Sequence, residues 1–156
     1  MKENEFELEI GSFDYEDIEV KHEALSFKNV NIRDLKGNCK IQVKGLEGVN
    51  IPHIHIICTN FECCVSLLRS EYFNHEEHMK EMPSKAEKSF YEFMKKNPSS
   101  DFIKNNPEYI DCKTNYEVAC KAWTRANDPN FVIPLEAINN NYCLNYSKII
   151  NPNKRK

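Results

Sequence analysis

The fold is decided by residues 52–58, which read Pro-His-Ile-His-Ile-Ile-Cys. β-Branched residues are favoured in strands, and successive side chains of a strand point to opposite faces of its sheet. The stretch therefore predicts a strand in which His53 and His55 project side by side from one face. Ile54 and Ile56 project from the other face and anchor it in the core.

A second strand is predicted directly after the first. Residues 59–60, Thr-Asn, separate the histidine strand from residues 61–68, Phe-Glu-Cys-Cys-Val-Ser-Leu-Leu. A two-residue turn predicts an antiparallel hairpin in which His55 lies opposite Cys64. The core face would then carry Ile54, Ile56, Cys58, Phe61, Cys63 and Val65. The other face would carry His53, His55, Glu62, Cys64 and Ser66.

The remaining patterns indicate strands first and helices second. Alternation predicts strands at residues 6–10, ended by Gly11, and at 40–44 after a turn at Gly37, with further strand character in 25–32. Capping boxes that begin at Ser84 and Thr114 are each followed by apolar residues at helical spacing, which predicts two helices. We expect an α+β fold, in which an antiparallel sheet of four to five strands (about 5–68) carries two main helices (about 84–127) on one face.

Composition restricts the possible classes of protein. A chain of 156 residues with 40% hydrophobic content predicts one domain, residues 1–150, followed by a basic flexible tail, 151–156. The net charge of -3 disfavours a general nucleic-acid binder, and no run suits a membrane span or a signal peptide. Seven cysteines, an odd number, argue against a secreted disulfide framework and favour the cytoplasm.

The histidine pair is the first candidate site. Two imidazoles two residues apart on a strand can reach one metal ion such as zinc, with Glu62 or Cys64 as a third ligand. His75 or His78, in the run His-Glu-Glu-His at 75–78, could supply a fourth. The alternative is that the imidazoles make only hydrogen bonds on an exposed sheet face, and that the 75–78 run is a solvated loop.

Enzymatic readings of the same residues are incomplete. A histidine-triad hydrolase would need a third histidine where Ile57 stands. Cys64 opposite His55 could form a cysteine–histidine nucleophile pair, but no further catalytic group accompanies it. A metal-dependent phosphoester hydrolase or nuclease remains as an alternative, with His53 and His55 as ligands and Glu62 or Glu76 as base.

Residues 52–130 resemble a domain family of small uncharacterised bacterial proteins, often found beside toxin–antitoxin and mobile-element genes. The resemblance rests on the Pro-His-Ile-His-Ile strand, on Met82-Pro83 opening an aromatic-rich helix, and on a second helix from Asn115 to Trp123. Ile54 stands where that family usually has phenylalanine. The resemblance implies the fold and no activity.

The function that these observations favour is binding to another protein. We expect a small cytoplasmic protein of prokaryotic or phage origin, acting as an antitoxin-like partner or as an inhibitor in phage–host conflict. Tyr72 and Tyr91 are the aromatic side chains expected to face a protein partner. The predicted strand at residues 6–10, in which Glu7 and Glu9 alternate with apolar residues, is expected at an edge of the sheet and could also pair across a homodimer axis. A purely structural accessory domain is the third possibility.

Overall fold

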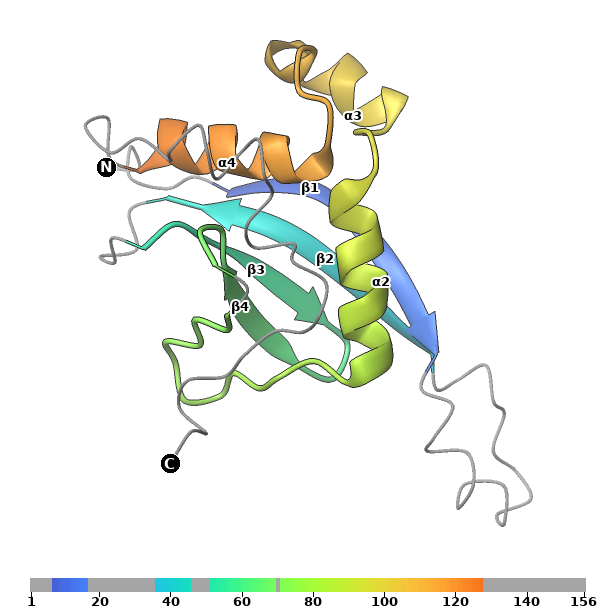
Figure 1. Cartoon of the computed structure of the whole chain (residues 1–156), viewed down its shortest axis with the longest axis vertical. Coiled ribbons are helices and arrows are strands. Elements are labelled where there is room, and N and C mark those ends of the chain that lie inside the picture. Colours follow the sequence, from blue (N-terminus) through green and yellow to red (C-terminus); the bar gives the residue numbers. More distant parts are fainter. Residues whose placement is uncertain (1–6, 17–35, 46–50, 70, 128–156) are drawn as a thin grey trace.

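The computed structural model of the chain describes residues 7–16, 36–45, 51–69 and 71–127. Four antiparallel strands form one sheet in sequence order, β1 (Glu7–Glu16), β2 (Lys36–Lys44), β3 (His53–Cys58) and β4 (Glu62–Ser66) (Figure 1). The helices follow, α2 (Ser84–Lys95), α3 (Ser100–Asn105), η3 (Pro107–Tyr109) and α4 (Asn115–Ala126). The α+β fold is confirmed, whereas the predictions for residues 25–32 and 151–156 lie outside the described residues.

The β3–β4 hairpin has the predicted register. His55 lies opposite Cys64, Ile54 opposite Val65 and Ile56 opposite Cys63. The Cys58 amide donates a hydrogen bond to the Phe61 carbonyl at 2.8 Å and so closes the turn. Strand β2 continues both faces of the hairpin: Ile41 pairs with Ile56 on the core face, and Gln42 pairs with His55 on the histidine face.

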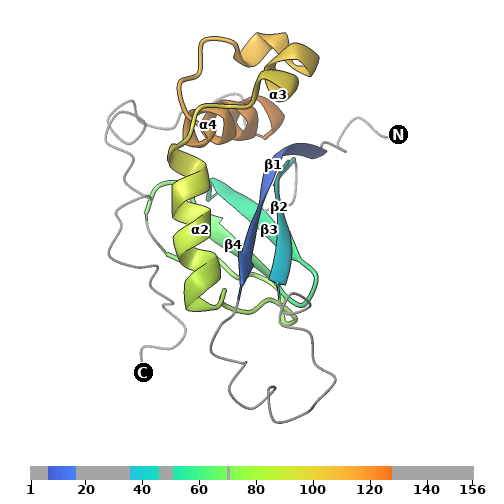
Figure 2. The same cartoon turned by 90° about the vertical axis from the view of Figure 1, so that its right-hand side faces the viewer.

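The isoleucine face of the sheet is covered by the two long helices. Helix α2 runs alongside β1, and α4 crosses the upper end of the sheet, where it contacts β1, β2 and β3 (Figures 1 and 2). Phe13 of β1 meets Phe90 and Phe93 of α2 with ring centroids 6.2 and 6.5 Å apart. The core joins both layers through Ile41, Val43, Ile54, Ile56, Phe90, Met94, Val118 and Trp123.

Strand β1 continues past Gly11, where the sequence predicted its end. The pairing with β2 shifts register between Glu9 and Gly11, which is a β-bulge. Inward-facing residues therefore change parity: Ile10, the extra residue of the bulge, is buried, and Phe13 and Tyr15 are the buried residues after it. Simple alternation cannot predict a strand whose period slips by one residue.

Gly37 is also part of a strand and not of a turn. Its Cα faces the ring of Tyr15, and a Cβ built there would lie 2.1 Å from Tyr15 Cε1. Gly37 and Tyr15 are register partners across β1 and β2, so the glycine makes room for the aromatic ring. The prediction of a turn at this position was wrong, because the glycine is required by packing.

The two expected capping boxes have different outcomes. The Thr114 hydroxyl accepts a hydrogen bond from the Glu117 amide at 3.1 Å and caps α4. Helix α2 instead has Pro83 at its N-cap, which offers no side-chain acceptor, and the Glu87 amide donates to the Pro83 carbonyl at 3.0 Å. The Glu87 carboxylate accepts the Tyr72 hydroxyl at 2.5 Å. None of the helices in the described ranges is long and apolar enough to cross a membrane.

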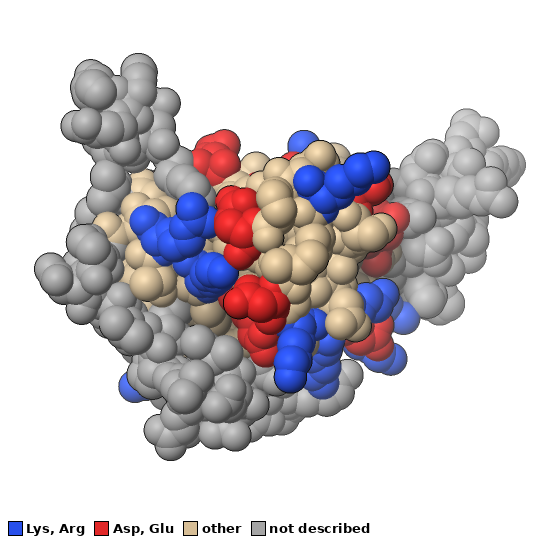
Figure 3. Space-filling model, turned by 90° about the horizontal axis from the view of Figure 1, so that it is seen from above, with Lys and Arg blue, Asp and Glu red and all other residues tan. Residues whose placement is uncertain are grey.

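Charges of both signs alternate over the end of the molecule formed by α3, η3 and α4 (Figure 3). Lys121 pairs with Asp111 at 3.5 Å, and Arg125 pairs with Glu108 at 3.4 Å. Such interspersed pairs contribute little to stability but keep the local potential near neutral.

Replacing Gly11 by alanine should destabilise the fold by about 1 to 3 kcal/mol. Gly11 has a φ of 151°, which L side chains rarely adopt, and a Cβ would lie 2.4 Å from Phe93 Cζ. Urea unfolding would measure the loss. The exposed neighbour Ser12→Ala is the control and should change stability by less than about 0.5 kcal/mol. Equal effects of the two variants would contradict this account of the bulge.

Candidate metal centre

Three potential metal ligands lie together on the face of the sheet opposite the helices. His53 and His55 project from β3, and Cys64 projects from β4 directly across from His55. These side chains are almost completely buried, with exposed fractions of 1% for His53, 2% for His55 and 0% for Cys64. The sheet face that carries the histidines was expected to be exposed in one of the alternatives, but it is buried.

A segment that we call the strap, residues 71–80, covers this face. It runs along the outer edge of β4 through backbone hydrogen bonds, from the Ser66 amide to the Glu71 carbonyl (2.9 Å) and from the Phe73 amide to the Cys64 carbonyl (2.7 Å). The side-chain oxygen of Asn74 accepts the Cys64 amide at 2.8 Å. The strap is thus anchored to β4 on both sides of Cys64 by hydrogen bonds that involve no metal.

The strap brings His75 to the two strand histidines. Four donor atoms, one each from His53, His55, Cys64 and His75, lie within 4.8 Å of one another. His75 is the most accessible of the four, with 16% of its side chain exposed. The geometry therefore groups Cys64 and His75, and not Glu62 and His78, with the histidine pair.

The three imidazole rings are arranged as they would be around a single ion. Ring centroids are 5.2 Å apart for His53–His55, 5.2 Å for His53–His75 and 5.6 Å for His55–His75. Zinc–nitrogen bonds of about 2.0–2.1 Å at tetrahedral angles place ligating ring centres about 5 Å apart. Cys64 Sγ lies 3.4 Å from the His55 ring, at Nδ1, so the sulfur belongs to the same group of side chains.

The strand histidines have partners that orient them for ligation. His53 Nδ1 lies 2.7 Å from the Ile51 carbonyl oxygen, so this nitrogen carries the proton and donates it. The lone pair of His53 is then on Nε2, the arrangement typical of metal-ligating histidines. His55 Nδ1 lies 3.4 Å from Glu62 Oε2, and a carboxylate accepting from a ligand imidazole fixes its tautomer in the same way.

Glu62 and His78, the other predicted ligands, lie at the edge of this cluster. Glu62 Oε1 accepts from His78 Nε2 at 2.8 Å, and the two side chains are 23% and 56% exposed. Burial raises the pKa of Glu62, but hydrogen bonds from His78 and His55 outweigh it and bring that pKa below its ordinary value. Glu62 is therefore a charged carboxylate beside the cluster.

The arrangement does not form a cysteine–histidine nucleophile relay. Both Cys64 Sγ and Glu62 Oε2 approach the same nitrogen of His55, Nδ1, whereas a relay needs one partner on each ring nitrogen. Cys64 is also inaccessible, with Met79 Sδ packed 3.8 Å from its sulfur. The neighbouring Cys63 faces the core, and burial raises the pKa of its thiol.

Tyr72 and Tyr91 were expected to face a partner, and both are buried, at 3% and 2% exposure. The Tyr72 hydroxyl donates to Glu87 and accepts from the Met82 amide at 2.8 Å, so it fastens the strap to the start of α2. Tyr91 packs beside Phe90 in the core. Both tyrosines therefore point from their own segments, the strap and α2, into the interior.

Two strap residues that support the cluster were not predicted from the sequence. Asn74 anchors the Cys64 amide, and the ring of Phe73 packs against His53 and His75 with centroids 5.1 and 5.5 Å away. Their only sequence signal is their position directly before His75.

No family model matches the chain, and neither a curated protein nor a solved structure matches it. The family resemblance of residues 52–130 stays a prediction.

Replacing Asn74 by alanine should destabilise the metal-free protein by about 1 to 3 kcal/mol, because the Cys64 amide would lose its acceptor inside the strap. Urea unfolding in the presence of a chelator measures this. Glu77→Ala, on the exposed side of the same strap, is the control. If both variants unfold at the same urea concentration, the anchoring role of Asn74 is wrong.

Proposed function

We propose that this is a metal-binding protein that holds one zinc ion between β3, β4 and the strap. The observation that carries the proposal is the mutual spacing of the three imidazoles, 5.2 to 5.6 Å between centroids, around a buried cysteine. Three nitrogen donors and one sulfur donor suit Zn²⁺, whereas Mg²⁺ and Ca²⁺ prefer oxygen ligands.

The proposed centre is of the closed, structural kind. Four protein donors complete a tetrahedral zinc ion, whereas catalytic zinc sites usually keep one position for water or substrate. Burial of Cys64 and both strand histidines favours the same conclusion. These features support a metal-binding role over the phosphoester hydrolase or nuclease alternative.

The proposed ion would join the strap to the hairpin beneath it. His75 is the single strap residue in the cluster, and the other three donors come from β3 and β4. Coordination would therefore stabilise the strap against opening. Binding to a protein partner, as an antitoxin-like subunit or inhibitor, stays a prediction from the sequence.

Protein purified without a histidine tag should contain about one zinc per chain by mass spectrometry of the metals. Zinc added to chelator-treated protein at about 100 times its dissociation constant should stabilise the fold by about 2.7 kcal/mol. Cobalt substitution should give the visible absorption of a tetrahedral ion and the ultraviolet band of a cobalt–thiolate bond.

Cys64→Ser should lose the thiolate band, and His75→Ala, which removes the donor contributed by the strap, should bind cobalt more weakly than the wild type. Cys58→Ser is the matched control, because Cys58 lies on the same hairpin but on its core face. A wild-type protein that takes up neither zinc nor cobalt, with no rise in melting temperature, would refute the proposal.

A further inference from the structure

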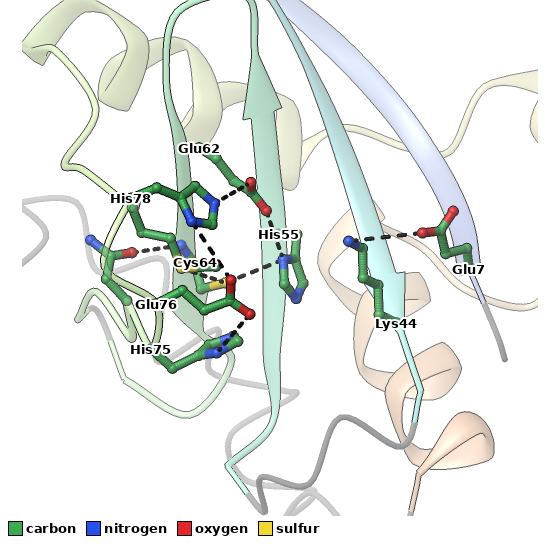
Figure 4. Close-up of polar contacts among 10 residues, drawn as sticks. Glu7, Lys44, His55, Glu62, Cys64, His75, Glu76 and His78 are labelled. Carbon is green, nitrogen blue, oxygen red and sulfur yellow. Dashed lines mark hydrogen bonds and ion pairs between the residues drawn. The ribbon is translucent and has the colours of Figure 1, made fainter. Parts of the chain in front are cut away.

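Glu62 joins the buried cluster to the protein surface. It is the first residue of β4, and its two carboxylate oxygens make separate contacts. Oε2 lies 3.4 Å from Nδ1 of the buried His55, and Oε1 lies 2.8 Å from Nε2 of the exposed His78 (Figure 4). One carboxylate therefore binds an interior imidazole and a surface imidazole together.

A second carboxylate repeats this pattern on the other side of His78. His78 Nδ1 lies 3.6 Å from Glu76 Oε1, and Glu76 Oε2 lies 4.0 Å from His75 Nδ1. The contacts thus run in sequence from His55 through Glu62, His78 and Glu76 to His75. Both ends of this chain of contacts are members of the proposed ligand set.

Glu62 is placed to act from outside the ligand set. The donor atoms that lie within 4.8 Å of one another come from His53, His55, Cys64 and His75, and do not include the Glu62 carboxylate. Glu62 Oε2 lies beside Nδ1 of His55, so a His55 ring that held the ion through Nε2 would keep this contact. A carboxylate in this position orients a ligand imidazole and makes it a better donor.

We infer that Glu62 is a positioning residue of the metal centre and that its charge favours a divalent over a monovalent ion there. This inference rests on the proposed zinc site. The Cys64 thiolate alone balances the single charge of Cu⁺, whereas the nearby carboxylates of Glu62 and Glu76 add negative charge that favours Zn²⁺. Cu⁺ is the informative competitor, because cysteine and histidine also ligate it.

The size of the effect follows from Coulomb's law. The attraction between the carboxylate and the ion is proportional to the ion's charge, so removing the carboxylate charge costs a divalent ion twice the free energy that it costs a monovalent one. A loss of hydrogen-bond geometry alone would affect both ions alike. The ratio of Zn²⁺ to Cu⁺ affinity therefore separates the charge effect from a purely structural effect.

The test is the variant Glu62→Gln in the full chain, which keeps the shape of the side chain and removes its charge. Its Zn²⁺ affinity, measured by chelator competition, should fall roughly 10- to 100-fold. Its Cu⁺ affinity, measured anaerobically with a Cu⁺ chelator, should fall roughly 3- to 10-fold, the square root of the zinc effect. Glu77→Gln, which removes an exposed charge from the same strap, is the control and should change neither affinity.

Equal losses for the two ions would refute the role of the charge, and unchanged affinities would refute the inference as a whole. A wild-type protein that binds no zinc would instead refute the proposed function, so the two failures are distinguishable. If Glu62→Gln does not fold, His78→Ala provides the second test at an exposed position. It releases Glu62 Oε1 and should weaken zinc binding several-fold, and an unchanged affinity would overturn the inference.

Discussion

The pairing of His55 with Cys64 across β3 and β4 is the constraint on which the rest of the structure depends. Side chains alternate along both strands, so this one pairing assigns every other residue of the hairpin to a face. A slip of one residue would turn Cys64 into the core and bring Cys63 among the histidines. The register that forms the isoleucine core and the register that assembles the candidate centre are therefore the same.

Both faces of β3 are buried, and each face is covered by a different kind of structure. The isoleucine face meets α2 and α4 through apolar packing. The histidine face carries polar groups that would be costly to bury without partners. The strap supplies such partners, because it adds hydrogen bonds along the edge of β4 and places Phe73 and His75 against the strand histidines. Covering β4 also removes one free edge of the sheet.

The hairpin could be predicted from sequence because the residues that decide its pairing are neighbours in the chain. A two-residue turn and two alternating runs fix the pairing of Cys64 with His55, and this excluded Cys58 and Cys63 from the cluster. The choice of His75 over His78 could not be predicted in the same way. Which of the two histidines joins the cluster depends on the position of the strap along β4. That position is decided by contacts such as the hydrogen bond from the Cys64 amide to Asn74. The bulge at Gly11 lies against Phe93 of α2, which is distant in sequence, and Tyr72 is held by its hydrogen bond to Glu87 of the same helix.

The anchoring of the strap separates metal binding from folding. In small zinc modules the ion supplies the folding free energy, and the metal-free chain is unfolded. Here the sheet and helices bury a continuous core. The strap is held by hydrogen bonds that the amides of Ser66 and Phe73 donate and by the one that Asn74 accepts from the Cys64 amide. The donor atoms of the proposed centre are thus assembled without a metal, and little ordering entropy would oppose coordination. Substitution of a ligand should consequently lower metal affinity far more than it lowers the stability of the metal-free fold. The difference between the loss of metal affinity and the loss of stability of the metal-free protein measures how far the fold alone positions the ligands.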